Sequence, residues 1–294
     1  FNETIFYAES GGQISDKGSI VGNNFTANVI KSSKIKLGND VNIFLCSVEI
    51  ISGKLEIGET VTQNLDLDYR KQICSHHSAT HLLHEALRQK LGNHVAQKGS
   101  LVTSQRLRFD FSHSKPIGSL ELKVIEDVVN QRIFSNEDVT TRTMTPVKAI
   151  ENGAIALFGE KYGDEVRVVS MGKCIDPNRN AWSIELCGGT HVKNTSEISS
   201  FKIISETGVS SGVRRIEAIT NIAAIDFYNS ELDKINNISG FLNTDSSQVL
   251  KKIEQLLVEN KKINKQLKQL KMNSINLESS GLNKEKIKDI IFEY

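Results

Sequence analysis

Four side chains, in two separate pairs, have the types and spacing of metal ligands. His77 and His81 lie four residues apart in a segment with helical periodicity, so their rings project from one face about one turn apart. Cys187 and His191 are also four residues apart, and two of the residues between them are glycines that permit a tight turn. Three imidazoles and a thiolate suit a tetrahedral zinc site. We therefore expect one Zn²⁺ per chain, held by these four side chains.

The other histidines and cysteines near these pairs are weaker candidates. His84 follows the histidine pair by one turn and His76 points about a quarter-turn away, so we interpret both as neighbouring or surface groups. Cys174 precedes a run of turn-forming residues. Cys46 and Cys74 fit a strand and a helix start without chemistry.

A zinc peptidase is the main alternative when two histidines share a helical face. Its motif needs a glutamate directly after the first histidine as general base. Ser78 occupies that position here, so the spacing disfavours peptide hydrolysis.

The elements that must position these residues follow an α+β pattern. Residues 1–68 consist of short β-rich runs broken by Gly and Asn, and they predict a small β-barrel. The period becomes helical from Tyr69 to about Gly92. Beyond that point we expect strands at 107–111, 166–170 and 201–205 and a helix at 120–134. The predicted domains are a β-barrel over 1–68, a zinc-containing α+β domain over 69–221 and a helical region over 222–294.

The C-terminal region predicts long helices with one apolar seam. Its members alternate spacings of four and three, as in a coiled coil or an antiparallel helical hairpin, and are Val249, Ile253, Leu256, Asn260, Ile263, Leu267 and Leu270. An asparagine in such a seam often fixes register and partner number. We expect a homo-oligomer through these helices. A helix packed on its own domain is the alternative.

Composition excludes several classes of protein. Hydrophobic residues make up 38% of the 294 residues and charged residues 24%, as in soluble globular chains. The chain has no apolar run as long as a membrane span and no secretory signal. Its four cysteines lack the spacing of a disulfide framework. We expect a cytoplasmic protein, and the start at Phe1 suggests a piece of a longer chain.

Several motifs occur together in a consistent order. They lie at residues 77–83, 97–102, 107–113, 156–167, 187–191 and 211–217, with a glycine motif that includes Gly11 and Gly12 at 6–13. Together they resemble the editing portion of alanyl-tRNA synthetase, in which a β-barrel with the glycine motif precedes the editing core. The resemblance covers residues 1–220, and after Asn221 only the helical architecture is similar.

The resemblance implies a function and a set of site residues. The zinc ligands of the family correspond to His77, His81, Cys187 and His191, and positions that line its editing pocket correspond to Thr80, Gln97 and Ser100. The family's editing domain hydrolyses tRNA(Ala) mischarged with serine or glycine. Nothing in the chain resembles the ATP-dependent aminoacylation domain, so we expect this part of an alanine–tRNA ligase to edit but not to charge tRNA. One departure is the longer segment 173–184, which predicts a lengthened loop near the metal.

The need for editing has a physical reason. A pocket shaped for alanine cannot strongly exclude glycine, and apolar pockets reject an added hydroxyl only about a hundredfold, a limit for which synthetases are themselves the standard example. Thr80 beside His81 can present a hydroxyl to serine, whereas alanine would leave that hydroxyl unpaired. The alternative for Thr80 is a hydrogen bond to the backbone four residues earlier.

The resemblance also implies tRNA(Ala) as partner. The net charge is only +1, but lysines concentrate in the C-terminal quarter. Phosphate contacts are expected from Arg106, Arg108, Arg214 and Arg215, and from Lys251, Lys252, Lys261, Lys262, Lys265, Lys268 and Lys271. Each lysine taken alone also fits a solvated helix face.

Three other functions stay open. A free-standing editing protein would share the barrel and zinc core without any synthetase module. A zinc-containing RNA-binding module would have the metal site without catalysis. The editing domain of threonyl-tRNA synthetase shares the two histidine-containing motifs, but the glycine-motif barrel and the C-terminal helices favour the alanine family.

Overall fold

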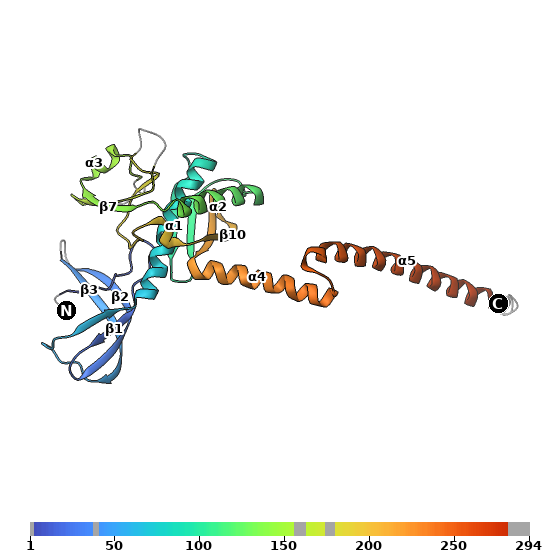
Figure 1. Ribbon diagram of the computed structural model, residues 1–294, viewed down its shortest axis with the longest axis horizontal. Coiled ribbons are helices and arrows are strands. Elements are labelled where there is room, and N and C mark those ends of the chain that lie inside the picture. The colour runs from blue at the N-terminus through green and yellow to red at the C-terminus, as the bar shows by residue number, and fades with distance from the viewer. Residues whose placement is uncertain (1–2, 38–40, 156–162, 174–179, 282–294) are drawn as a thin grey trace, which may run out of the picture. The chain divides into compact units, whose positions relative to one another are not determined.

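The computed structural model describes residues 3–37, 41–155, 163–173 and 180–281, and Figure 1 shows the course of the chain. The chain divides into two compact units, Phe1–Phe227 and Tyr228–Tyr294. The first unit combines antiparallel sheets with helices, which confirms the predicted α+β class. Cys174 and parts of the segments 156–167 and 173–184 lie outside the described residues.

The N-terminal segment forms an antiparallel sheet. Its strands are β1 (Gly18–Val21), β2 (Phe25–Leu37), β3 (Val41–Gly53) and β4 (Thr62–Leu65), in the order β3-β2-β1-β4. Phe6, Ile20, Phe25 and Val29 form its apolar core. The β-rich runs expected within residues 1–68 are therefore confirmed as strands.

The predicted β-barrel over 1–68 is wrong, because this sheet is open. Among the described residues, β3 and β4 are its two edges and do not pair. The reason is strand length: β2 and β3 have 13 residues each, whereas β1 and β4 have four each. The outer part of the β2–β3 hairpin thus has no strand opposite it, and Phe44 and Leu45 there are exposed.

One long helix, α1 (Leu67–Leu91), carries the histidine pair. It begins at Asp66, whose carboxylate accepts the Tyr69 N–H at 2.9 Å, and it ends at Gly92, whose φ of 114° is accessible to glycine. Every residue from Ile73 to Leu87 is buried. The helix expected from Tyr69 to about Gly92 is confirmed.

A four-stranded sheet and a second helix pack on α1. The sheet has the order β10-β11-β6-β5, and its strands are β5 (Gln97–Val102), β6 (Leu107–Ser112), β10 (Phe201–Ser210) and β11 (Val213–Thr220). Helix α2 (Ser119–Phe134) shares a core with α1, in which Leu82 and Leu83 lie with Ile125, Val129 and Phe109.

A smaller sheet faces α1 from another side and carries the second ligand pair at its end. It consists of β7 (Val139–Met144), β8 (Val166–Met171) and β9 (Ser183–Leu186), accompanied by α3 (Pro146–Glu151) and the short helix η1 (Thr195–Ile198). Side chains alternate across a strand. Val169 and Met171 join the core with α1, whereas Val168 and Ile184 join a separate cluster on the opposite face.

The C-terminal region is helical, as expected. Its elements are α4 (Asn221–Leu242), the short helix η2 (Ser246–Gln248) and α5 (Val249–Gly281). Apolar side chains are exposed along both long helices, including Leu232 and Ile235 in α4 and Ile263 and Leu267 in α5. An antiparallel hairpin that closes this seam is therefore not seen among the residues that the structure describes. None of the helices searched is long and apolar enough to span a membrane.

Candidate metal centre

The four predicted ligand side chains come together in the structure. Cys187 Sγ lies 3.4 Å from His77 Nε2 and 3.2 Å from His191 Nε2. With His81, the ligand atoms of the four residues all lie within 4.8 Å of one another. Two pairs more than a hundred residues apart in the sequence thus meet at one point.

Local structure aims each pair at this point. In α1, the spacing of four residues stacks the rings of His77 and His81 with centroids 5.3 Å apart. The loop after β9 must approach closely, because a Cβ at Gly189 would overlap the His77 ring. Arg167 donates from Nη1 to the carbonyl oxygens of Cys187, at 3.0 Å, and of Gly189, and so holds the loop in place.

The other ring nitrogen of each histidine has its own partner. His81 Nδ1 pairs with Glu185 Oε2 at 2.8 Å, and His191 Nδ1 with Ser78 Oγ at 3.1 Å. His77 Nδ1 lies 2.7 Å from the side-chain oxygen of Gln13. Such partners are typical of metal-binding histidines, because they fix the tautomer and leave Nε2 for the metal.

Charge in the cluster is unevenly distributed. Burial tends to raise the pKa of the Cys187 thiol, but the neighbouring imidazoles of His77, His81 and His191 hold it well below 9.0. Burial also tends to lower the pKa of His81, but Glu185 and Cys187 raise it to about 10. Burial and His77 lower the pKa of His191 to about 3. A thiolate and a neutral imidazole are therefore ready as ligands, whereas a metal must displace a proton from His81.

The residues fit a zinc ion. Zinc bonds of about 2.0–2.3 Å to nitrogen and sulfur imply nitrogen–sulfur separations of roughly 3.6 Å in a tetrahedron, close to those observed. His81 Nε2 is buried, and in the described part of the chain it has no hydrogen-bond partner. A buried polar atom without a partner is costly, and a metal ligand bond satisfies it. The cluster can hold a metal, with zinc as the ion of choice for this donor set.

The expected editing-pocket residues lie on the elements next to the cluster. Thr80 in α1 is buried, and its hydroxyl donates to the His76 carbonyl at 2.8 Å, which is the backbone bond named above as the alternative. The Thr80 oxygen keeps lone pairs that can accept a proton from a ligand. Gln97 and Ser100 lie in β5, which contacts α1. Their role in a pocket stays a prediction.

The four arginines expected to contact phosphate are held by carboxylates. Arg215 makes two bonds to Asp110 at 2.7 and 2.8 Å, and Arg214 pairs with Glu206 through two nitrogens. Arg106 lies 3.6 Å from Glu217, and Arg108 lies 3.8 Å from Asp110. The Arg214 and Arg215 pairs join neighbouring strands, whereas Arg108 and Asp110 both lie in β6. At each arginine a phosphate would compete with an existing carboxylate, and a tRNA contact stays a prediction.

The two neighbouring histidines are both buried, so neither is a surface group. His76 Nε2 accepts the Thr220 N–H at 3.1 Å, and burial lowers the pKa of this imidazole to about 4. His84 Nδ1 bonds to Glu185 Oε1 at 3.0 Å, so that one carboxylate joins His84 to the predicted ligand His81. The free cysteines Cys46 and Cys74 lie outside the cluster.

Sequence reasoning missed the partners behind the ligands. Gln13, Ser78, Arg167 and Glu185 all support the cluster, but none was assigned to it from its spacing. Weak signals existed: Gln13 directly follows the glycine pair, and Glu185 precedes the cysteine by two residues. Nothing local reveals that these side chains meet, because 64 residues separate Gln13 from His77 and 101 separate His84 from Glu185.

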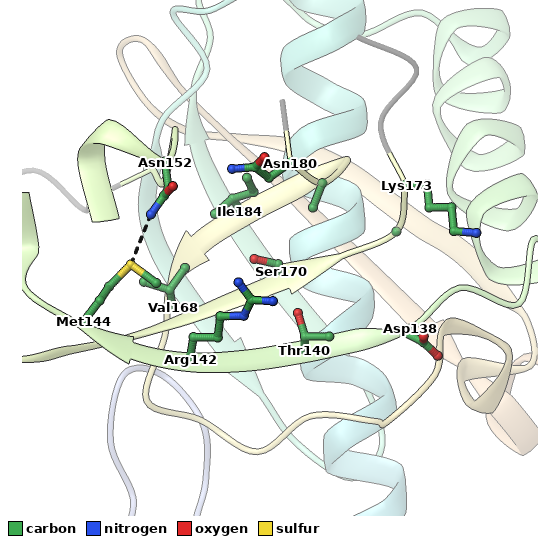
Figure 2. Close-up of a pocket in the computed structure, with 12 residues that line it drawn as sticks. Asp138, Thr140, Arg142, Met144, Asn152, Val168, Ser170, Lys173, Asn180 and Ile184 are labelled. Carbon is green, nitrogen blue, oxygen red and sulfur yellow. Dashed lines mark hydrogen bonds between the residues drawn. The ribbon is translucent and has the colours of Figure 1, made fainter. Parts of the chain in front are cut away.

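A hollow of about 470 Å³ lies on the face of the small sheet opposite the cluster. Figure 2 shows Thr140 and Arg142 on β7 with Ser170 and Val168 on β8 beside it. Side chains alternate along β9, and Ile184 lines the hollow. The next residue, Glu185, therefore lies on the opposite face of the sheet. The hollow therefore does not contain the predicted ligands and is distinct from the metal centre.

Two segments match known protein families. Residues 166–217 match the family described as the threonyl and alanyl tRNA synthetase second additional domain, and residues 1–69 match tRNA synthetases class II (A). The matches confirm the resemblance to the alanyl- and threonyl-tRNA synthetases. The first segment is thus similar to the second additional domain of the threonyl and alanyl enzymes, and the second segment to class II synthetases. Cys187 and His191 lie within the first match, whereas His77 and His81 lie outside both.

The second match bears on one expectation. We expected that nothing in the chain resembles the ATP-dependent aminoacylation domain. Residues 1–69 match a family of class II synthetases, and the described residues of this segment include the open sheet and the first residues of α1.

Proposed function

We propose that this chain hydrolyses tRNA(Ala) mischarged with serine or glycine, as the editing part of an alanine–tRNA ligase. The observation that carries the proposal is the convergence of two ligand pairs, one inside and one outside the segment that matches the synthetase domain. The glycine motif before the core and the helices after it support an alanine rather than a threonine enzyme.

The reaction is the hydrolysis of an ester. Water adds to the carbonyl carbon of the aminoacyl group, the bond from that carbon to the ribose oxygen breaks, and the ribose hydroxyl leaves with a proton. The four residues of the cluster would hold a zinc ion, which would supply a Lewis acid that polarises a carbonyl or orients the amino acid. Because four protein ligands fill a tetrahedral site, the substrate would have to displace one of them or add as a fifth ligand. The chain itself holds three of the four predicted ligand residues in place through Glu185 at His81, Ser78 at His191 and Arg167 at the Cys187 carbonyl.

Thr80 is the proposed determinant of selectivity. It lies between His77 and His81 in α1, and its oxygen can accept the hydroxyl proton of serine. Alanine has no hydroxyl to offer, so it gains nothing at this position. Gln97 and Ser100 are the other proposed pocket residues.

The deciding experiment is a deacylation assay with this chain. Transfer RNA for alanine is charged separately with serine, glycine and alanine, and tRNA for threonine is charged with serine. We expect release of serine and glycine from tRNA(Ala) and little release of alanine. Release from tRNA(Thr) alone would point to a threonine enzyme. An absence of release from every tRNA by zinc-loaded protein would leave a non-catalytic RNA-binding module.

A free-standing editing protein would give the same result in that assay. The two are distinguished by the gene, because a free-standing protein begins shortly before Phe1, whereas a ligase continues upstream into an aminoacylation domain. The exposed lysines of α5 support a role in tRNA binding in either case.

A further inference from the structure

Gln13 brings the segment before β1 to the predicted metal centre. It follows the glycine pair of the motif and is fully buried. Its backbone forms a parallel bridge with Val102, the last residue of β5. The Gly12 carbonyl accepts the Val102 N–H at 2.7 Å, and the Ile14 N–H donates to the Val102 carbonyl at 3.1 Å. The motif thus adds to the edge of the sheet beneath α1.

The hydrogen bonds of Gln13 fix the orientation of its amide. The Thr190 backbone N–H can only donate, and it lies 2.9 Å from the atom assigned as Oε1 of Gln13. That atom is therefore the oxygen. Consistently, Gln13 Nε2 donates to the Thr190 hydroxyl at 2.9 Å.

The same assignment determines the tautomer of His77. Its Nδ1 lies 2.7 Å from Gln13 Oε1, and an amide oxygen only accepts. In the neutral imidazole the proton then sits on Nδ1, which leaves the lone pair on Nε2. That nitrogen faces Cys187 Sγ at 3.4 Å, inside the cluster.

Two glycines make this approach sterically feasible. Gly12 has a φ of 83°, and a Cβ there would overlap the Ser100 carbonyl of β5. A Cβ at Gly189 would overlap both the His77 ring and Gln13 Oε1. Glycines from two distant motifs therefore surround the contact between Gln13 and His77.

We propose that Gln13 is a positioning residue of the metal centre, whose carbonyl oxygen holds the His77 proton on Nδ1 and so presents Nε2 as a ligand. The N-terminal segment before β1 then contributes to the site instead of merely preceding it. The inference rests on the metal centre of the proposed function, but it does not depend on which ester the chain hydrolyses.

The test compares zinc affinity between variants, measured by competition with a chromophoric chelator. Gln13→Met removes the acceptor at similar volume, and loss of such a partner typically weakens metal binding by about 10–100-fold. Gln13→Glu keeps an acceptor for both N–H groups, so its affinity should stay close to that of the parent chain. Gln63→Met is the matched control, because Gln63 also accepts a backbone N–H (Ile5) and donates to a carbonyl (Glu3), both within the N-terminal segment.

The proposal is overturned if Gln13→Met binds zinc as tightly as Gln63→Met, or if Gln13→Met and Gln13→Glu lose affinity equally. Should Gln13→Met fail to fold, nitrogen NMR of the zinc-free parent chain decides: a proton on His77 Nδ1 supports the assignment, and one on Nε2 overturns it. Failure of the proposed function looks different. In that case zinc binding still depends on Gln13, but no mischarged tRNA is deacylated.

Discussion

Helices α1 and α5 are both long and rich in polar residues, but their surroundings are opposite. In α1 every residue from Ile73 to Leu87 is buried, whereas in α5 almost every described side chain after Val249 is exposed. The buried polar groups of α1 have specific partners, such as Glu185 for His81 and Thr220 for His76. The polar residues of α5 therefore face solvent, whereas those of α1 form hydrogen bonds and ion pairs in the interior.

The difference follows from what each helix contacts. Helix α1 lies against strands of two sheets and against α2, so its whole circumference is covered. Buried polar groups are retained only where partners satisfy them. Helix α5 has an apolar seam and a lysine-rich face, both exposed in the described chain, and such a helix depends on a partner for most of its stability.

The largest effect is expected from the cluster that α1 helps to build. Cys187→Ala removes the thiolate ligand, and the zinc content should fall from about one per chain to near zero. Cys46→Ala, at a half-buried cysteine outside the cluster, should leave it unchanged. Elemental analysis of freshly purified proteins gives the answer, and a parent chain without zinc would remove the assigned role of all four ligands.

Matched leucine substitutions sharpen the comparison between the two helices. Leu83 in α1 is fully buried, so Leu83→Ala should lower the free energy of unfolding by about 2–5 kcal/mol. Leu267 in α5 is 47% exposed, and Leu267→Ala should change the stability of the first unit by less than about 0.5 kcal/mol. Urea unfolding measures both. Equal losses would mean that a partner buries the α5 seam as thoroughly as the core buries α1.

Selectivity should respond to a change that leaves the shape of α1 intact. Thr80→Val keeps the volume but removes the hydroxyl, so the barrier to serine release should rise by roughly 1–3 kcal/mol. Glycine release should change little, since glycine has no hydroxyl to recognise. The comparison requires rates for both substrates, and an unaltered serine rate would move recognition to another residue.

The smallest effect on the first unit is expected from removing α5. Truncation before Val249 should convert a dimer to a monomer, because the exposed seam is the proposed contact, and it should leave zinc binding intact. Sedimentation measures the oligomeric state, and a monomeric full chain at micromolar concentration excludes the dimer. Binding of tRNA should weaken and lose part of its salt dependence if the lysines contact phosphate.

The sequence by itself determined the parts of this protein that depend on local spacing. Two residues four apart in a helix share a face, and two glycines between Cys187 and His191 allow a tight turn, so all four ligands were predicted from neighbouring residues. Helix α1 and strands β6, β8 and β10 were also predicted, because periodicity is a local property of the sequence.

Only the tertiary structure decided what lies behind the ligands and how the first sheet ends. Gln13 contacts His77 across 64 residues of sequence, and Glu185 contacts His84 and His81 across 101 or more. No local sequence pattern predicts contacts between residues so far apart. Closure of a barrel depends on pairing between its outermost strands, and the short β4 does not pair with the long β3. Spacing selects the ligand residues, whereas long-range packing supplies the hydrogen-bond acceptors that orient them.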